Sequence, residues 1–368
     1  MPVKLILEIL GLAAVFVLWG CAAVIDQDSA LAVAPYDIND NGLIIVEVRV
    51  NGQGPFEFAL DTAASISVVF DKLRNDLALE PVQGEAVTIH GAVATGQFPL
   101  LNIDHLSVGR EVWAAPRIAS IPGETLVSRG IDGILGVDFL RRYAVGFSVR
   151  DRVVRLYPPD LISGRSFRDW TSIQLQPEPV GKSGAALYFF EIEIAGQRIP
   201  AIFDLGAGPN MINWPAANSL GLDPVDSRGD DQFSGAIETT DVVARFRIDE
   251  VTTGRIRWRN EVFSIAELEI FTKLLRGDGP CAILGAGLFT QRDFIIDFAR
   301  TRLLVKAAMD EMDVTGTGDS SQLLLRDPVR SRLAGVREQH DTEPDREYGE
   351  HERARRELNN AVCDRSPG

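Results

Sequence analysis

The chain is poor in the residues that build disulfide frameworks and metal sites. Among its 368 residues are three cysteines and four histidines. The cysteines stand far apart, so they predict no disulfide framework, and the histidines show no spacing typical of zinc ligands. Basic residues are also in deficit: the net charge is −15, which would repel a nucleic-acid duplex. We therefore expect no metal site and no nucleic-acid partner.

Long hydrophobic runs are scarce as well. The apolar run at residues 9–20, which follows Lys4, is short for a transmembrane helix and typical of a secretory signal. Three interpretations stay open: a lipoprotein signal with Cys21 carrying the lipid, signal-peptidase cleavage at Ala30-Leu31-Ala32, or an uncleaved anchor. We expect residues 1–34 to be this segment, and the protein to be exported to the periplasm or cell envelope, with attachment to the membrane as one alternative.

The other end of the chain lacks apolar periodicity. From residue 309 to residue 368 the apolar pattern is lost, and residues 338–360 are dense in charged side chains with almost no aliphatic ones. Such a composition favours a disordered tail or a solvated helix. We expect no core element there.

What the chain does contain is one unit written twice. Residues 45–52 and 190–196 both alternate apolar and polar side chains and end at a glycine, which is typical of a strand and a turn. Each copy then enters a short apolar run that stops at an aspartate, Asp61 in the first copy and Asp204 in the second. Internal repetition of this kind indicates two similar structural units.

A second matching block supports the repeat. Ile134-Leu135-Gly136 and Ile283-Leu284-Gly285 each precede a short predicted helix and a hairpin-like stretch. The two aspartates are 143 residues apart (204 − 61), and the two glycines are 149 apart (285 − 136). Helical periodicity is otherwise scarce, apart from a predicted helix at residues 215–220. The fold class predicted is all-β, in two pseudo-symmetric lobes with short helices.

The repeat also sets the expected domain boundaries. We expect an N-terminal lobe at residues 35–160 and a C-terminal lobe at residues 184–308. Residues 161–183, which are rich in Pro, Gly and Ser, are predicted to be the linker.

In these blocks the chain resembles the retropepsin-like (retroviral-type) aspartic proteases, in a tandem two-lobe form. Leu60-Asp61-Thr62-Ala63-Ala64-Ser65 is similar to the Asp-Thr-Gly-Ala-Ser catalytic loop of that family, and Phe203-Asp204-Leu205-Gly206-Ala207-Gly208 to a second version of it. The Ile-Leu-Gly blocks resemble the later family motif that packs behind the loop. The resemblance spans residues 42–306, most of the chain.

The resemblance implies an aspartic endopeptidase that acts on an extended polypeptide. Asp61 and Asp204 would lie about 3 Å apart and share one proton, because two carboxylates that close cannot both ionise. The ionised one would take a proton from water while the other donates to the scissile carbonyl oxygen. No metal or cofactor is implied, and a monomer would be active. Which aspartate holds the proton stays open.

The resemblance also implies roles for residues around the pair. Thr62, Ala63, Leu205 and Gly206 would support the two loops, with the Thr62 hydroxyl bracing the opposite loop. His90 and Gly91 in the first lobe, and Gly235 in the second, would belong to flap hairpins that cover the substrate.

Two departures from the family pattern motivate an alternative. Ala63 replaces a glycine and would be strained if its φ were positive. Leu205 replaces a hydroxyl residue, which would leave the brace between the loops lopsided. A peptide-binding protein that has lost turnover is therefore the second hypothesis, and a β-rich scaffold with the two aspartates far apart is a third.

Two further residues are given structural rather than catalytic interpretations. Asp138 follows Gly136 and is predicted to cap the short helix there. Cys281 precedes an apolar run and is predicted to be a small buried residue rather than a nucleophile.

Overall fold

The computed structural model describes most of the two repeats. It describes residues 29–91, 95–162, 169–180, 185–222, 232–234, 239–266, 268, 270–271 and 279–307. All of them belong to one compact unit of the chain, Met1–Thr315. The predicted signal or anchor at residues 9–20 and the charged segment from 309 onward lie outside the described residues.

The first repeat is a β lobe with short helices. Its elements are β1 (Ala32–Ile38), β2 (Ile44–Val50), β3 (Gln53–Leu60), β4 (Val68–Phe70), α1 (Asp71–Asp76), β5 (Pro81–His90), β6 (Thr95–Asn102), β7 (His105–Val108), β8 (Glu111–Ala114), β9 (Arg117–Ile121), α2 (Glu124–Val127), β10 (Gly133–Leu135), α3 (Val137–Leu140), β11 (Ala144–Ser148), β12 (Val153–Tyr157) and the 3-10 helix η2 (Pro159–Ile162). The predicted helix after Gly136 is α3, so that prediction is confirmed.

The second repeat has the same character. Its elements are β13 (Trp170–Gln174), β14 (Gln176–Val180), β15 (Ala185–Ile194), β16 (Gln197–Phe203), β17 (Asn210–Ile212), α4 (Trp214–Ser219), β18 (Gln232–Ser234), β19 (Thr239–Thr253), β20 (Ile256–Ala266), β21 (Ala282–Leu284), α5 (Ala286–Phe289), β22 (Phe294–Asp297), the 3-10 helix η4 (Phe298–Arg300) and β23 (Arg302–Lys306). The helices predicted at residues 215–220 and after Gly285 are confirmed as α4 and α5.

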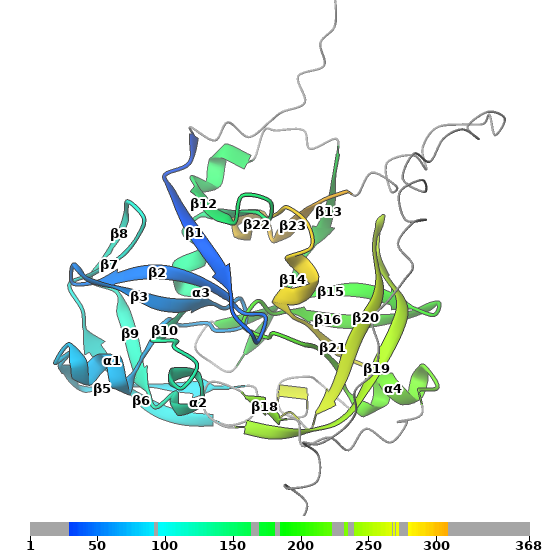
Figure 1. Ribbon diagram of the computed structural model, residues 1–368, viewed down its shortest axis with the longest axis horizontal. Helices are drawn as coiled ribbons and strands as arrows, with labels where there is room; N and C mark the ends of the chain where they lie inside the picture. The colour runs from blue at the N-terminus through cyan, green and yellow to red at the C-terminus, as the bar shows by residue number, and fades with distance from the viewer. Residues whose placement is uncertain are drawn as a thin grey trace, which may run out of the picture. The chain divides into compact units, whose positions relative to one another are not determined.

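Strand pairing repeats between the lobes, which explains why the sequence repeats. In the first lobe β10 runs parallel to β3 and antiparallel to β4. In the second lobe β21 runs parallel to β16 and antiparallel to β17. Each lobe therefore inserts the strand of its Ile-Leu-Gly block beside the strand that ends at its aspartate. The predicted all-β fold of two similar lobes is the observed one (Figure 1).

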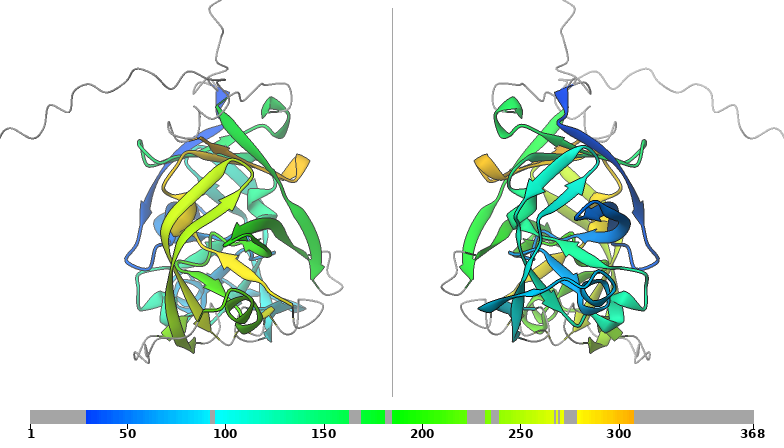
Figure 2. Two further views of the ribbon diagram at one scale, coloured as in Figure 1. Left: turned by 90° about the vertical axis from the view of Figure 1, so that its right-hand side faces the viewer. Right: turned by 90° about the vertical axis from the view of Figure 1, so that its left-hand side faces the viewer.

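A six-stranded antiparallel layer joins the lobes, and we call it the platform. Its order is β13-β23-β22-β11-β12-β1, so each lobe contributes three strands in mirrored order. The lobes meet where β11 pairs with β22, and there the rings of Phe147 and Phe294 stack with centroids 4.2 Å apart. The platform lies at one end of the view in Figure 1, and the β5–β6 hairpin lies toward the opposite end. Figure 2 shows the same separation from both sides.

Strands lie outside the predicted boundaries of both lobes, before residue 35 and within residues 161–183. β1 begins at Ala32, inside the segment predicted as signal or anchor, and Ala30 and Ala32 are buried. Residues 170–180, predicted as linker, form β13 and β14. Pro177 and Pro179 fit there because β14 is the edge strand of its sheet, where a missing N–H costs no ladder bond. Proline content therefore marks an edge strand here rather than a linker.

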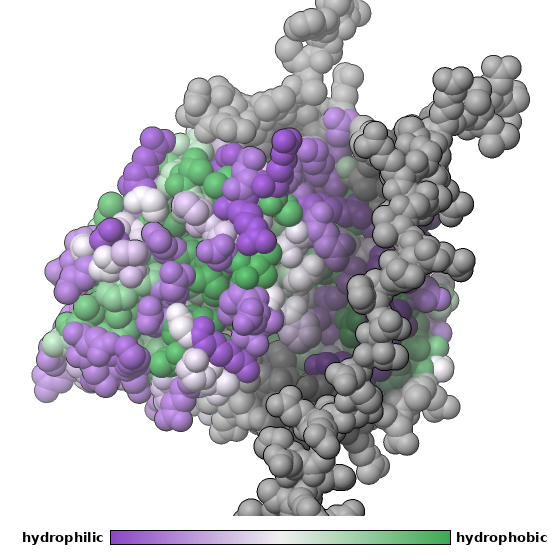
Figure 3. Space-filling view, viewed as in Figure 1, coloured by the Kyte–Doolittle hydropathy of each residue, from purple (hydrophilic) through white to green (hydrophobic). Residues whose placement is uncertain are grey.

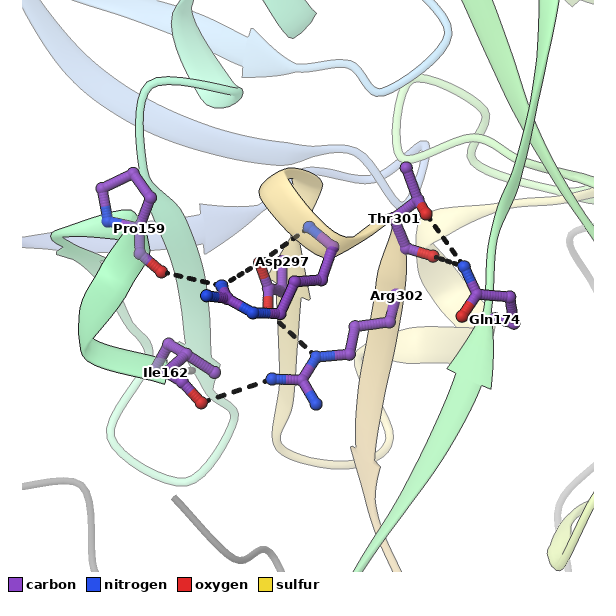
Figure 4. A network of polar contacts seen from close by, with 7 residues as sticks. Pro159, Ile162, Gln174, Asp297, Thr301 and Arg302 are labelled. Carbon is purple, nitrogen blue, oxygen red and sulfur yellow. Dashed lines mark hydrogen bonds and ion pairs between the residues drawn. The ribbon is translucent and has the colours of Figure 1, made fainter. Parts of the chain in front are cut away.

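A buried ion-pair network fixes one part of the platform (Figure 4). The Asp297 carboxylate is fully buried and accepts from Arg302 Nε at 2.9 Å, with Arg300 Nη1 at 3.5 Å. The same two guanidinium groups donate to the carbonyl oxygens of Pro159 and Ile162 in the first lobe, at 3.2 and 3.3 Å. The network therefore ties the β22–β23 hairpin of one lobe to η2 of the other.

The core is continuous and strongly apolar. One cluster of buried side chains runs through both lobes and the platform, and its largest fully buried members include Trp258, Phe58, Phe139 and Phe203. On the outside, hydrophilic and apolar side chains alternate over the face seen in Figure 3. The large hydrophobics exposed among the described residues are scattered along the chain, as is ordinary for a protein surface; they are Leu31, Val33, Val112 and Val262.

Candidate active site

Asp61 and Asp204 occupy equivalent places at the ends of equivalent strands. Asp61 follows β3, and its N–H donates to the Leu135 carbonyl at 3.0 Å. Asp204 follows β16, and its N–H donates to the Leu284 carbonyl at 3.1 Å. Each aspartate is thus anchored by the neighbouring Ile-Leu-Gly strand, which is why the two motifs recur together in the sequence.

The structure brings these two side chains into contact. Asp61 and Asp204 lie near enough for each carboxyl group to shift the pKa of the other. The second loop also lies against the first carboxylate, since a Cβ added to Gly206 would sit 2.7 Å from Asp61 Oδ1 and overlap the rest of that carboxyl group. Gly206 is therefore required by space: any larger side chain would displace Asp61.

Backbone N–H groups hold each carboxylate in its loop. Asp61 Oδ1 accepts from the N–H groups of Ala63 and Ala64 at 2.7 and 2.8 Å. Asp204 Oδ1 accepts from the Gly206 N–H at 2.8 Å. Asp204 is buried, whereas Asp61 retains partial exposure. The two carboxylates are therefore related by the repeat but differ in their surroundings.

The causes that shift the pKa therefore also differ between the two carboxyl groups. Burial and the nearby charge of Asp61 hold the pKa of Asp204 well above its ordinary value. Burial also raises the pKa of Asp61, but the N–H groups of Ala64 and Ala63 and the hydrogen bond from Asp204 oppose that rise. The arrangement favours a proton on Asp204 and a negative charge on Asp61.

Thr62 braces the second loop by itself. Its hydroxyl donates to the Phe203 carbonyl at 2.8 Å and accepts from the Leu205 N–H at 2.9 Å. Leu205 is fully buried and has no hydroxyl with which to return these bonds. The expected lopsided brace is therefore what the structure shows, with both bonds made by one buried threonine.

Ala63 carries no backbone strain. It is absent from the residues with positive φ, so its side chain imposes none of the conformational cost that a left-handed position would. Ala63 packs instead against an apolar cluster of the second lobe that contains Ala207, Met211 and Cys281. The replacement of glycine at this position adds a contact between the lobes.

Three supporting residues were not predicted from the sequence in this role. The Gly136 N–H donates to Ser67 Oγ at 3.0 Å, and the Gly285 N–H donates to Asn210 Oδ1 at 3.0 Å. The Asp138 carboxylate in turn accepts from Ser67 Oγ at 2.6 Å and from the Phe139 N–H at 2.9 Å. Burial raises the pKa of Asp138.

These contacts attach the loop that follows each aspartate, which we call the catalytic-type loop, to the N-terminus of the helix behind it, α3 in the first lobe and α5 in the second. The prediction that Asp138 caps this helix is wrong, because Gly136 is the N-cap and no side chain makes a cap bond there. The main partner of Asp138 is Ser67 in the loop. Ser67 and Asn210 each stand six residues after the aspartate of their repeat. This shared polar position is the sequence signal that could have identified them.

The β5–β6 hairpin carries the residues predicted as the first flap. His90 pairs with Thr95, and His90 Nδ1 and Thr95 Oγ1 share a hydrogen bond of 3.1 Å. Gly91 follows directly at the end of β5. The side chains of Val87, Ile89 and Phe98 pack against the same apolar cluster as Ile66 and Ala64 of the first loop, so one side of the hairpin faces that loop.

The counterpart in the second lobe is the pairing of β18 with the start of β19, and Gly235 lies outside the described residues.

Cys281 has the character of a structural residue. It is buried, and burial raises its pKa to about 12, so it stays a thiol at physiological pH. Within the described ranges, no group of three or more His, Cys, Asp or Glu side chains could hold a metal ion. Nor do those ranges contain a helix with the length and hydropathy needed to span a membrane.

Comparison with known proteins places this geometry in a family. A model of the family described as aspartyl protease matches residues 46–139 and 190–288, once for each repeat and together about half of the chain. No curated protein matches the chain. Among solved structures, that of conglutin gamma, a basic 7S globulin from lupine seeds, is similar with 12% identity and a TM-score of 0.44, over 75% of this chain and 95% of that one. By the extent of the family match, the chain belongs to the aspartyl protease family.

Proposed function

We propose that the protein is an aspartic endopeptidase of the tandem two-lobe form, in which Asp61 and Asp204 together activate a water molecule. The observation that carries the proposal is the approach of two equivalent loops: each holds its carboxyl group by backbone N–H bonds, and the Gly206 loop lies directly against the Asp61 carboxyl group. A turn-capping role would account for one such aspartate, but it does not account for two equivalent loops that place their carboxyl groups side by side.

The surroundings of the pair support distinct roles for its members. Asp61, which accepts two N–H bonds and carries the charge, would act as the general base that takes a proton from water. Asp204, which keeps its proton, would donate it to the scissile carbonyl oxygen. The water oxygen would form a bond to the carbonyl carbon and give a tetrahedral diol. The diol would collapse with cleavage of the C–N bond as Asp61 gives its new proton to the leaving nitrogen and Asp204 takes a proton back from a diol hydroxyl. No covalent intermediate is required.

The substrate we propose is an extended polypeptide. The β5–β6 hairpin would cover it and offer strand-like hydrogen bonds, with His90 and Gly91 near the hairpin end. The apolar side chains of Ile66, Ile89 and Phe98 would contact its side chains. We also propose export to the periplasm or cell envelope, on the basis of the N-terminal apolar run.

The two departures that motivated a catalytically impaired alternative leave the dyad intact. Thr62 makes both brace bonds without a hydroxyl at Leu205, and Ala63 sits at a φ that alanine adopts without strain. We therefore make peptide binding without turnover an outcome of the test rather than a second proposal.

The test is digestion of casein and of a peptide library between pH 3 and 8. Wild type should cleave, while Asp61→Asn and Asp204→Asn should each lose at least about a hundredfold in kcat/KM, as removal of a general acid or base does. Asp76→Asn is the matched control, because Asp76 is 55% exposed and its ion pair is with Lys72 on the surface. Cleavage that survives both dyad substitutions would refute the proposal, and binding without cleavage by wild type would favour the impaired alternative.

A further inference from the structure

The turn between β1 and β2 is held together by one side chain. Asn39 Oδ1 accepts from the N–H groups of Asn41 and Leu43 at 3.1 and 3.0 Å. The Asn39 carbonyl accepts from the Gly42 N–H at 2.8 Å, and its own N–H donates to the Leu43 carbonyl at 3.1 Å. Asparagine side chains stabilise turns in this way. We call residues 39–43 the Asn39 turn.

This first-lobe turn lies directly against the catalytic-type loop of the second lobe. A Cβ added to Gly208 would overlap the Asn41 carbonyl oxygen and sit 2.9 Å from the carbonyl carbon. A Cβ added to Gly42 would lie 3.4 Å from Gly208 Cα. Since Gly208 stands four residues after Asp204, the backbone of the Asn39 turn forms one wall of the loop that holds Asp204.

The same loop is held from its other side by the helix α5 region. The Ala286 N–H donates to the Ala207 carbonyl at 2.8 Å, and a Cβ on Gly285 would lie 2.8 Å from the Gly208 carbonyl oxygen. The segment from Ala207 to Gly208 is thus enclosed between its own lobe and the Asn39 turn of the other lobe. A displaced turn would give this loop room to move, and Asp204 with it.

Asn39 holds the turn with an uncharged acceptor, which suits a position close to the two carboxyl groups. Its Oδ1 is fully used by the turn, while its Nδ2 is buried and finds no hydrogen-bond partner among the described residues. An unpaired buried N–H group lowers stability. Aspartate would accept the same two bonds without that group, but it would bring a third carboxylate toward Asp61 and Asp204. An uncharged acceptor holds the turn and leaves the dyad's electrostatics undisturbed.

From these contacts we infer that Asn39 is a positioning residue for Asp204: through the Asn39 turn, the first lobe sets where the second carboxyl group stands relative to Asp61. The inference rests on the proposed dyad chemistry. A displacement of about 1 Å in a reacting group lowers catalysis by up to about a hundredfold, so the role predicts a loss in kcat rather than in substrate affinity.

The experiment compares Asn39→Ala with Asn51→Ala. Asn51 is a matched control, because its Oδ1 also accepts two backbone N–H bonds, from Asp104 and His105, in a turn remote from the dyad. We expect Asn39→Ala to lower kcat at least tenfold with KM within twofold of wild type, and to move the pH profile of kcat. Asn39→Asp, which keeps both acceptor bonds, should recover kcat to within threefold at its own pH optimum. Equal kinetics in Asn39→Ala and Asn51→Ala would overturn the inference.

A second pair of variants probes the contact from the other lobe and covers the case in which Asn39→Ala does not fold. Gly208→Ala, which places a methyl group onto the Asn41 carbonyl, should show the same kcat loss. Gly279→Ala, whose added Cβ would meet nothing within 4 Å, should match wild type. If Gly208→Ala is as active as Gly279→Ala, the wall formed by the turn has no effect and the inference is wrong.

A titration separates failure of this inference from failure of the proposed function. The carboxyl carbons of the dyad are followed by NMR in protein labelled at the aspartate side chains, with Asp204→Asn identifying their signals. Asn39→Ala should shift the dyad titration by at least half a pH unit while Asn51→Ala leaves it unchanged, whether or not wild type cleaves peptides. No cleavage by wild type would refute the endopeptidase proposal, and an unshifted titration would refute the positioning role.

Discussion

At the scale of single residues, each structural role in the site is carried by a single residue. Thr62 alone makes the two hydrogen bonds that brace the second loop, and Gly206 alone leaves room for the Asp61 carboxyl group. Asp204 is the more buried of the two carboxyl groups, and burial raises its pKa. Where no second residue shares a task, a single substitution should have a large and specific effect.

Replacing Thr62 by valine should remove both brace bonds at nearly constant shape. We expect a loss of about 2–4 kcal/mol in the free energy of unfolding, from two buried hydrogen bonds and the unpaired groups left behind, measured by urea denaturation. Activity should fall further than this instability explains, because the loop of Asp204 loses its brace.

Thr253→Val is the matched control for this substitution. The Thr253 hydroxyl donates to the Glu191 carbonyl at 2.8 Å, away from the dyad. It should lower stability while leaving the kcat of the folded protein unchanged. Equal activity in the two variants would contradict the bracing role of Thr62.

Asp204→Asn should be more thermostable than wild type at pH 7. A carboxyl group whose pKa is raised in the folded state stabilises that state fully below its unfolded value, near 3.8, and progressively less as pH rises toward the folded pKa. Above that pH range wild type has lost the stabilisation that protonated Asp204 provides. Asparagine does not titrate, so the variant keeps its stability. Melting temperatures measured from pH 3 to 8 should therefore diverge with increasing pH, and curves that stay parallel would contradict the raised pKa.

The pH dependence of kcat should be bell-shaped, with a decline on both the acidic and the basic side. The proposed mechanism needs Asp61 ionised and Asp204 protonated, so kcat should decline when pH falls through the lower apparent pKa of the pair and when it rises through the upper one.

At the scale of elements, the platform joins the lobes through backbone ladders and one buried ion-pair network. The β11–β22 ladder spans the junction, and Asp297 draws Arg300 and Arg302 toward the first-lobe carbonyls of Pro159 and Ile162. Because both kinds of contact cross between the lobes, the platform should resist separation of the lobes as one unit.

Asp297→Ala should destabilise the protein by about 3–5 kcal/mol, since it removes one partner of a buried pair and leaves two guanidinium groups without their anion. Chemical denaturation followed by tryptophan fluorescence measures the loss. Asp76→Ala is the control: Asp76 pairs with Lys72 on the surface with 55% of its side chain exposed, and such pairs contribute about 0–1 kcal/mol. Similar losses in the two variants would show that the Asp297 network adds no stability beyond a surface pair.

At the scale of the whole molecule, both carboxylates come from one chain. The two loops meet through contacts within the chain, including the Thr62 brace and the packing of Ala63 on the second lobe. The proposed dyad would therefore be complete within one chain.

The protein should therefore be active as a monomer. Specific activity measured from about 10 nM to 10 μM protein should stay constant, with light scattering reporting the 40.3 kDa mass of the chain. A loss of specific activity on dilution, accompanied by a change in mass, would show that a second copy is required.

Much of this could be predicted from the sequence, because the relevant signals are local. Alternation of apolar and polar residues specifies strands, and the recurrence of Asp61 and Asp204 before matched Ile-Leu-Gly blocks specifies two equivalent loops. The helices at α3, α4 and α5 followed from the same patterns. The proline content of residues 161–183 led to the prediction of a linker, but Pro177 and Pro179 lie in the edge strand β14, where proline is tolerated.

The tertiary structure alone decided how the halves act on each other. That the pKa of Asp204 is raised depends on burial, which no local pattern records. That Thr62 serves both brace bonds, and that the Asn39 turn lies against Gly208, depends on contacts between residues more than a hundred positions apart. Sequence periodicity describes each lobe separately, whereas the distance between two loop tips is set by the packing of the whole platform and core.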